Sequence, residues 1–318
     1  MYMLKLIPDD TRIPFMRFRH IFVSVSGLAV AAAIVLLIVK GLTFGIDFAG
    51  GILVEVRLPQ VANLAQMRDE LNKLNIGTVN LQEFGKPTDV LIRLPRQEGG
   101  EKGQETAVAK MKQALGTGVD YRRTEFVGPK VSKELLTEGM LAVGAAMIAM
   151  LIYIWLRFEW QFGLAAVTAL MHDVLLTLGV FSLLGLEFDL STVAAVLTIA
   201  GYSINDTVVV FDRIREDLRK YKALPFDDLL NGAINSTLSR TVLTSGMTLV
   251  AVLALFFLGG EVIRDFSFAM TWGIVVGTYS SICVAVPLLL YFGLNTKARG
   301  GAGEEGDEDA GEEASERP

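Results

Sequence analysis

One apolar stretch carries side chains that could bind and release an ion. Residues 193–215 read VAAVLTIAGYSINDTVVVFDRIR, with Asp206 near the middle and the polar residues Tyr202 and Asn205 close by. A carboxylate inside hydrocarbon costs about 2.5–3.5 kcal/mol on insertion scales, so it is a functional candidate by default. Helical spacing predicts one face that looks into protein or water, made of Thr198, Tyr202, Asn205, Asp206, Val209 and Arg213.

A basic residue that opens a later apolar run, Arg240, is the counter-ion that we expect for Asp206. Burial raises the pKa of a carboxylate, whereas a nearby guanidinium lowers it. The two opposing effects together allow such a carboxylate to gain and lose a proton. Arginine keeps its charge and would act as a movable counter-ion. We therefore predict an ion relay of Asp206 and Arg240, with H⁺ or Na⁺ as the coupling ion. The alternative for Asp206 is a structural hydrogen bond between helices.

Other polar side chains in the apolar runs could assist such a relay. The candidate accessory groups are His172, Asp173, Asn205, Tyr202 and Thr244. For His172, a neutral core histidine bonded to a helix carbonyl is an equal alternative. Serines and threonines also recur at helical spacing in several runs, and for these hydroxyls alone helix packing is the simpler interpretation.

Several membrane-spanning helices are needed to position these groups. Of the 318 residues, 52% are hydrophobic, which is more than a soluble protein without a membrane segment carries. The sequence predicts a polytopic α-helical membrane protein with a first helix at 20–40 and further spans at 136–156, 162–184, 190–211, 241–258 and 267–292. Basic residues gather in the loops on one side, which predicts that both termini are cytoplasmic. An amphipathic helix is expected near 227–238.

Between the first and second spans lies a segment with the composition of a soluble domain. Strand patterns and helix patterns alternate in the order βαββαβ, which predicts a small ferredoxin-like α+β domain. The expected strands are 52–58, 78–84, 89–94 and 119–127, and the expected helices are 63–74 and 104–115. An odd number of crossings precedes the domain, so we expect it in the periplasm. Asp47, ahead of the first strand, is expected to cap the turn there.

The predicted organisation therefore has five parts. They are a cytoplasmic N-terminus at 1–19, the first helix at 20–40, the periplasmic domain at 41–134, a five-helix bundle at 135–293 and an acidic cytoplasmic tail at 294–318. Residues 300–318 contain eight acidic residues and one basic residue, a composition that predicts disorder. We assign this tail no role.

The sequence lacks the motifs that are typical of metal-binding and nucleotide-binding proteins. The chain has one cysteine and two histidines, without a Cys/His cluster and without either glycine-rich nucleotide motif. No metal, nucleotide or other cofactor and no nucleic-acid partner is therefore expected. Any work that the chain does would draw on an ion gradient or on a partner.

Five long motifs resemble a known family. They are GIDFAGG at 45–51, GPKVSKEL at 128–135, IAGYSINDTVVVFDRIRE at 199–216, INSTLSRTVLTS at 234–245 and LGGEVIRDFSFAMTWGIVVGTYSS at 258–281. In this order they resemble the SecD/SecF family of bacterial protein-export membrane proteins, within the resistance-nodulation-division superfamily of proton-driven transporters. The resemblance extends from about residue 15 to residue 293.

The resemblance implies more than the residues alone. It implies an auxiliary subunit of the Sec translocase in the bacterial inner membrane, which pairs with SecD and associates with the SecYEG channel and YajC. Such a subunit uses the proton-motive force, and not ATP, in the late periplasmic stage of export of an unfolded preprotein. The family's intramembrane aspartate and the arginine of the following helix match Asp206 and Arg240.

Three other functions remain open at this point. A related transporter could move lipids or small hydrophobic molecules with the same aspartate, although the segment 41–134 is small for an exit path. A scaffold without transport would assemble a translocon and would keep its activity when Asp206 is replaced by asparagine. An intramembrane aspartic protease would need two facing carboxylates, for which Asp173 and Asp206 are the one plausible pair.

Overall fold

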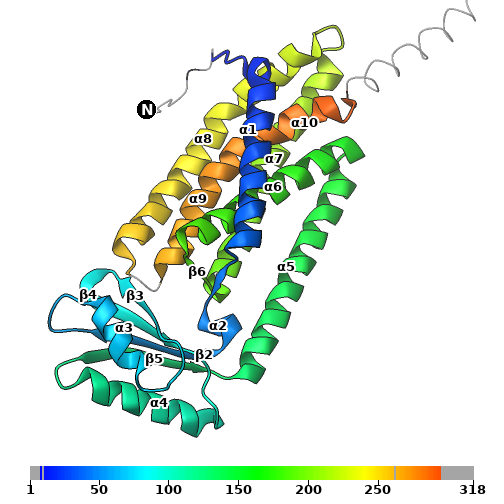
Figure 1. Cartoon of the computed structure of the whole chain (residues 1–318). Coiled ribbons are helices and arrows are strands. Elements are labelled where there is room, and N and C mark those ends of the chain that lie inside the picture. Colours follow the sequence, from blue (N-terminus) through cyan, green and yellow to red (C-terminus); the bar gives the residue numbers. More distant parts are fainter. Residues whose placement is uncertain (1–7, 9–10, 261–262, 295–318) are drawn as a thin grey trace, which may run out of the picture.

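The computed structural model describes residues 8, 11–260 and 263–294. It consists of a bundle of long helices and a small sheet domain at one end of the bundle (Figure 1). Residues 1–7, 9 and 10 of the predicted cytoplasmic N-terminus and all but the first residue of the predicted acidic tail lie outside the described residues.

Six helical segments of the described chain are long and apolar enough to cross a membrane. They make this chain a multi-pass helical membrane protein. A 3₁₀ turn, Phe15–Phe18, leads into α1, and the last segment runs from α9 through a π-helical turn, Ser281–Ala285, into α10. The helices are α1 (Arg19–Val39), α5 (Pro129–Arg157), α6 (Trp160–Leu184), α7 (Leu190–Lys220), α8 (Phe226–Leu258), α9 (Arg264–Ser280) and α10 (Val286–Tyr291).

The bundle differs from the expectation at α8. The amphipathic helix expected near 227–238 and the span expected from 241 are one continuous helix, Phe226–Leu258. The apolar side chains of its first turns, such as Leu230 and Ile234, are fully buried in the same core as the rest of the bundle. Because no proline interrupts the segment, packing carries the helix through the boundary that composition suggested. Arg240 consequently stands near the middle of a long helix and not at its start.

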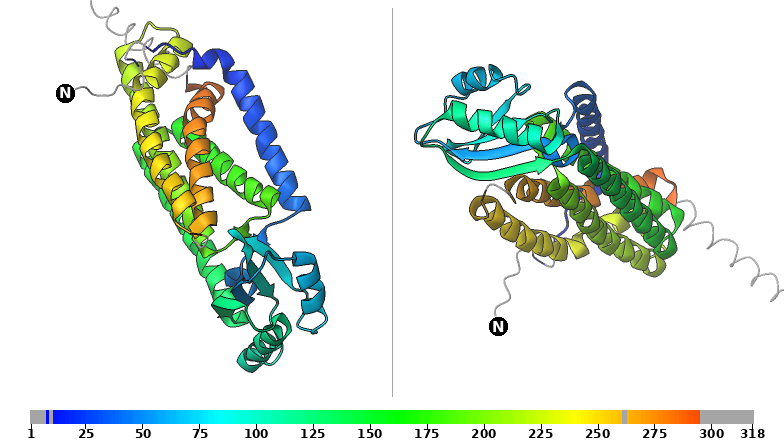
Figure 2. Two further views of the ribbon diagram at one scale, coloured as in Figure 1. Left: turned by 90° about the vertical axis from the view of Figure 1, so that its left-hand side faces the viewer. Right: turned by 90° about the horizontal axis from the view of Figure 1, so that it is seen from below.

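The sheet domain has the element order that the sequence predicts. Its elements are β2 (Gly51–Arg57), α3 (Leu64–Asn72), β3 (Asn80–Phe84), β4 (Lys86–Leu94), α4 (Gly100–Leu115) and β5 (Asp120–Val127). The four strands are antiparallel in the order β3-β4-β2-β5. Alternation along β2 directs Ile52, Val54 and Val56 into a core with α3 and α4, while Leu53 and Glu55 line the cleft beside the bundle. The helices α3 and α4 lie on the face of the sheet away from the bundle (Figures 1 and 2).

Short elements that the sequence did not predict join the domain to the bundle. β1 (Thr43–Phe44) pairs in parallel with β6 (Glu187–Phe188), the link between α6 and α7. After the short helix α2 (Ile46–Ala49), Gly50 and Gly51 both take positive φ values, and a Cβ on Gly51 would lie 2.5 Å from the Leu94 carbonyl oxygen. Only glycine fits this tight passage into β2.

The role expected for Asp47 is wrong. Its carboxylate does not cap its own turn but accepts the backbone N–H of Leu190, at 3.1 Å, at the start of α7. A carboxylate at a helix N-terminus satisfies a free donor and complements the helix dipole. Asp47 therefore ties the segment ahead of the sheet domain to α7, a contact between residues too distant in the chain for local turn rules to predict.

A partly buried ion pair in the sheet domain makes its stability depend on pH. The Arg57 guanidinium donates two hydrogen bonds of 2.6 Å to Asp89, and this contact lowers the pKa of Asp89 from 3.8 to about 2. The stabilisation is complete above pH 3.8 and is lost as the pH falls through about 2. We expect Arg57→Met to increase amide exchange in β2 and β4 of the full chain at pH 7. The difference from the wild type should shrink below pH 3.8.

Arg68→Met, on the exposed side of α3, is the matched control and should leave that exchange unchanged. A constant difference between Arg57→Met and the wild type down to pH 2 would contradict the assignment, because most of the contribution of an ionised Asp89 has to be lost by then.

Candidate functional site

Asp206 lies inside the bundle, where α7, α8 and α9 meet. Its side chain is buried, and Ser245 of α8 donates a long hydrogen bond of 3.4 Å to the carboxylate. The Ser245 hydroxyl also lies 2.8 Å from the Thr278 hydroxyl of α9, which itself donates to the Ile274 carbonyl. The single proton of Ser245 is thus shared between two acceptors. Among the described residues Asp206 accepts only this weak bond, so its charge is poorly compensated.

Arg240 and Asp206 do not form a direct ion pair in the described residues, although Arg240 is near enough to act on the carboxylate electrostatically. Arg240 lies on the exposed side of α8. The structure therefore places the two predicted partners on adjacent helices but not in contact. That arrangement fits a counter-ion that could approach or leave, and the pairing stays a prediction.

The predicted polar face of α7 is divided in the structure. Asp206 shares the buried face with Ile199, Ser203 and Val210, whereas Thr198 and Asn205 are exposed. The physical reason is the helical angle of about 100° per residue, which turns adjacent residues such as Asn205 and Asp206 to different sides. Tyr202 is half-buried, and its hydroxyl has no partner among the described residues.

An exposed polar strip inside a membrane helix bundle needs a partner. Thr198, Asn205, Arg240 and Thr244 are all exposed in this single chain, and the two threonines bond only to carbonyls of their own helices. Polar groups facing lipid are costly, while the same groups are satisfied against another protein surface or water. The strip therefore indicates a surface that a second membrane protein or a hydrated path covers.

A second buried carboxylate, Asp173, lies at the middle of α6. It accepts hydrogen bonds from Ser203 of α7 at 2.5 Å and from Ser280 of α9 at 2.7 Å. Its other oxygen lies 2.9 Å from Nδ1 of the neighbouring His172. The sequence analysis did not single out two of these hydroxyl groups, Ser280 beside Asp173 and Ser245 beside Asp206. Helical spacing could have indicated both, because Ser245 lies one turn after Thr241 and Ser280 lies one turn after Gly277.

The two aspartates do not form a protease-like pair. Asp173 is bonded to Ser203, Ser280 and His172, whereas Asp206 is bonded to Ser245. No hydrogen bond joins the two carboxylates in the described part of the chain. An aspartic hydrolase needs carboxylates that share one site, so this geometry does not support an intramembrane protease.

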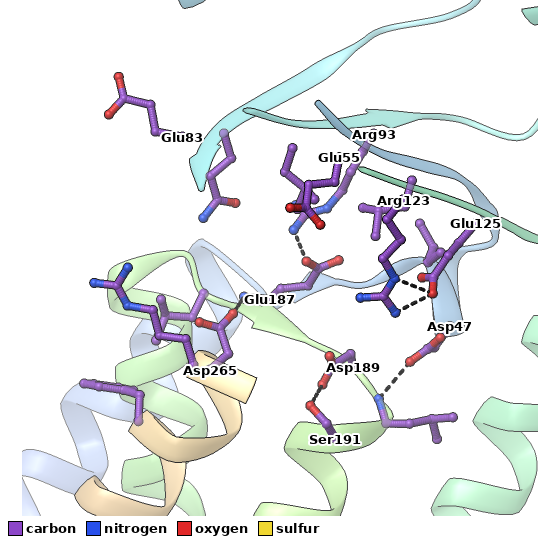
Figure 3. Close-up of a pocket in the computed structure, with 18 of the residues that line it drawn as sticks. Asp47, Glu55, Glu83, Arg93, Arg123, Glu125, Glu187, Asp189, Ser191 and Asp265 are labelled. Atoms are coloured by element: carbon purple, nitrogen blue, oxygen red, sulfur yellow. Dashed lines mark hydrogen bonds and ion pairs between the residues drawn. The ribbon is translucent and has the colours of Figure 1, made fainter. Parts of the chain in front are cut away.

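A cleft of about 510 Å³ separates the sheet from the end of the bundle. Figure 3 shows the charged side chains that meet across it, with Arg93 of β4 bonded to Glu187 of β6. Within the sheet Arg123 donates to Glu125 at 2.6 Å, and on the bundle side Asp265 accepts the backbone N–H of Glu187 at 3.2 Å. Sequence reasoning missed this cleft because its residues come from elements far apart in the chain.

Burial raises the pKa of Glu187, and the neighbouring Arg93 only partly opposes this effect. The contribution of Glu187 to stability is therefore greatest below pH 4.5 and declines as the pH rises through the raised value. We expect Glu187→Gln to keep β1 and β6 at least as protected from amide exchange at pH 7 as in the wild type. Arg93→Met should reduce this protection, because it leaves a buried charge without a partner.

Glu83→Gln, at an exposed position on the rim of the same cleft, is the control and should leave amide exchange in β1 and β6 unchanged. If Glu187→Gln instead reduces the amide-exchange protection of β6 as much as Arg93→Met does, the charge of Glu187 stabilises the contact. The predicted decline of its contribution to stability with rising pH would then be wrong.

The fold and the site together define a class of protein. Six spanning segments enclose carboxylates bonded to hydroxyls of neighbouring helices, and a sheet domain stands at the end of the bundle. These are features of a membrane transport component with ionisable groups at the centre of its bundle.

Comparison with known proteins then places the chain. Residues 107–295 match the family described as "Protein export membrane protein SecD/SecF, C-terminal", and residues 35–58 match the "SecD/SecF GG Motif". The chain belongs to the SecD/SecF family. The second match includes Gly50 and Gly51, whose positive φ values form the passage into β2.

The relatives have names that concern protein export. "Protein translocase subunit SecF" of Rickettsia akari is 45% identical over 92% of this chain and 95% of that protein. The protein of the same name from Cereibacter sphaeroides is 44% identical over 94% of each. These names describe transport components and not enzymes.

Two solved structures are also similar. SecDF from Thermus thermophilus, described as a translocon-associated membrane protein, is 36% identical and covers 92% of this chain with a TM-score of 0.82. SecDF in a super-membrane-facing form matches with a TM-score of 0.67 at 36% identity. The chain spans only 39% and 41% of those two longer chains.

Proposed function

We propose that this chain is an auxiliary subunit of the Sec protein translocase that pairs with SecD and uses the proton-motive force to promote late export through SecYEG. The observation that carries the proposal is the 45% identity, over nearly the whole chain, to proteins named as translocase subunits. The ion-driven part rests on Asp206, a buried carboxylate with one weak hydrogen bond.

The pairing with SecD has its own support. This chain matches about two fifths of the SecDF chain. We infer that the rest of that longer chain corresponds to SecD, which here would be a separate subunit. The exposed strip of Thr198, Asn205, Arg240 and Thr244 is the surface that such a subunit would cover. Arg240 would then lie between the two halves, where a change in their packing moves it toward or away from Asp206.

The proton is the coupling ion that the site favours. Sodium sites in transporters use backbone carbonyls freed where a helix is broken, and α7 runs unbroken through Asp206. With one hydroxyl in contact, the carboxylate offers few oxygens to a metal ion. One charge crossing 100 mV supplies about 2.3 kcal/mol, so a few protons per cycle suffice to drive a domain movement.

We place the sheet domain in the periplasm as a ferredoxin-like domain that contacts the emerging preprotein. Its element order and its sheet order β3-β4-β2-β5 support the ferredoxin-like assignment. Its outer strands leave backbone donors and acceptors that an extended chain could pair with, without sequence preference. In this arrangement the protein lies in the bacterial inner membrane with both termini in the cytoplasm, and YajC is a further expected partner.

The test is export in cells depleted of the native subunit and resupplied with this chain. We expect secretion of a periplasmic reporter to recover, and to fall again when a protonophore collapses the proton gradient at constant ATP. SecD should co-purify with the chain. Recovered secretion that ignores the protonophore but follows external Na⁺ would replace the proton by sodium, and no recovery despite normal membrane levels would refute the proposal.

A further inference from the structure

His172 and Asp173 are two buried ionisable residues that have no part in the proposed ion relay of Asp206 and Arg240. Both residues stand at the middle of α6 and are almost fully buried, with exposed fractions of 5% and 0%. Nδ1 of His172 contacts the carboxylate, while Nε2 is buried without a hydrogen-bond partner among the described residues. An imidazole whose Nδ1–H donates to a carboxylate keeps a bare lone pair on Nε2, which is a proton acceptor.

The charge of the pair favours uptake of one proton. Ser203, Ser280 and His172 can all donate to Asp173, a set of donors that suits an ionised carboxylate. With a neutral imidazole the pair then carries one net negative charge deep inside the bundle. Adding a proton at Nε2 makes the pair neutral overall, and a neutral ion pair is less costly to bury than an isolated charge.

The pair also joins three helices at the level of Asp206. Ser203 lies one turn before Asp206 on α7, and Ser280 lies two residues after Thr278 on α9. The two helices approach closely here, since a Cβ on Gly277 would lie 3.1 Å from the Ser203 side chain. Directly after Ser280 the last helix passes into the π-helical turn Ser281–Ala285, a local change of winding that is frequent at functional sites.

We propose that His172 and Asp173 form a second proton-binding centre, in which Nε2 of His172 takes up the proton and Asp173 holds α7 and α9 through Ser203 and Ser280. Because Ser203 and Asp206 share α7, a change of charge at one centre shifts the helix that carries the other. Proton binding at this centre stands on the geometry alone, and only its part in export rests on the proposed function.

The surroundings of the pair contain few other titratable groups. α1 contributes Ser26, bonded to the Tyr279 hydroxyl, and α5 carries its charged residues toward its two ends. On the helices that pack against α6, the titratable groups inside the apolar stretches are Tyr279 and Cys283 of the last helix, Tyr202 and Asp206 of α7, and Tyr153 of α5. The Tyr279 ring lies 6.3 Å from the imidazole, centroid to centroid.

The sequence makes a direct test possible because it contains only two histidines. In a His20→Gln background, the full-length chain labelled with ¹⁵N-histidine and reconstituted in lipid bilayers reports on His172 alone. We expect the Nε2 resonance to change from a bare to a protonated nitrogen between about pH 5 and pH 9, the range in which histidines titrate. Nδ1 should stay protonated throughout. An imidazole that keeps one protonation state over this range, neutral or charged, overturns the proposal.

Two variants test the roles assigned to the carboxylates. Asp173→Asn should lower the ratio of charged to neutral imidazole at least about tenfold at the wild-type midpoint, because an adjacent anion stabilises imidazolium. Asp206→Asn should change that ratio at least about twofold if α7 couples the centres, and an unchanged ratio overturns the coupling. Thr168→Val, an exposed α6 position whose hydroxyl bonds to the Leu164 carbonyl of its own helix, is the control and should leave the titration unchanged.

The outcome separates this proposal from the proposed function. A titrating His172 in a chain whose export ignores the proton gradient would leave the second centre in place and refute the ion-driven role. A His172 that does not titrate in a chain whose export requires Asp206 would refute the second centre alone.

Discussion

Replacing Asp206 by asparagine is expected to stop proton-driven export while the chain still assembles. Asparagine keeps the shape of the side chain and can accept the Ser245 bond, but it cannot take up a proton. If one proton is lost from the cycle at 100 mV, about 2.3 kcal/mol of driving force is lost, a factor of about 50 in an equilibrium. The measurement is secretion of a reporter, with the membrane level of the chain and its association with SecD checked alongside.

Asp212→Asn is the matched control for this experiment. Asp212 is an aspartate of the same helix, but its side chain is 41% exposed and is paired with Arg157 at 2.6 Å. We expect this variant to secrete normally. If Asp206→Asn also secretes normally, Asp206 only holds helices together, the relay is refuted, and the chain acts as a scaffold.

The second large effect is expected at the contact between α7 and α9. A Cβ on Gly273 would lie 2.3 Å from two side-chain atoms of Ile199, which is buried and stiff because it is β-branched. Gly273→Ala should therefore destabilise the bundle by about 1–3 kcal/mol, the usual cost of overpacking a core. Unfolding can be followed by the reactivity of Cys283, which is the only cysteine and is buried.

A second substitution identifies the cause. Ile199→Ala removes all three atoms that the new methyl group meets, so in its presence Gly273→Ala should cost little, a non-additivity that marks direct contact. Gly201→Ala, a helical glycine whose Cβ would meet nothing within 4 Å, is the control. Equal loss of stability in the presence and absence of Ile199 would show that the two helices do not meet through these residues.

The position of the candidate ion-binding carboxylate was predictable because the cost of burying it is local. A carboxylate in an apolar run is costly wherever the helix packs, so Asp206 stands out from composition alone. The six spans were predictable for the same reason, since a length of apolar sequence suffices to cross a bilayer. Alternation over residues 52–58 likewise predicted a strand, which is present as β2.

The environment of each group was not predictable in this way. Thr198 and Asp206 were expected on one face, but rotation of the helix against its neighbours buries Asp206 and leaves Thr198 exposed. The helix boundary expected before Arg240 is absent because contacts with the bundle extend α8. Asp47 caps α7, and Arg93 meets Glu187, through contacts between segments about a hundred residues or more apart.

The sequence by itself determined the kinds of the longer elements, their order along the chain and the residues whose burial has to be compensated. These follow from side-chain hydrophobicity and backbone periodicity, which act over a few residues. Tertiary structure alone decided that Asp173 meets Ser203 and Ser280, that Asp206 meets Ser245, and that a charged cleft separates the sheet from the bundle. Helix rotation and packing set those contacts, because a hydroxyl can bond a carboxylate only when two helices bring the two groups within hydrogen-bonding distance.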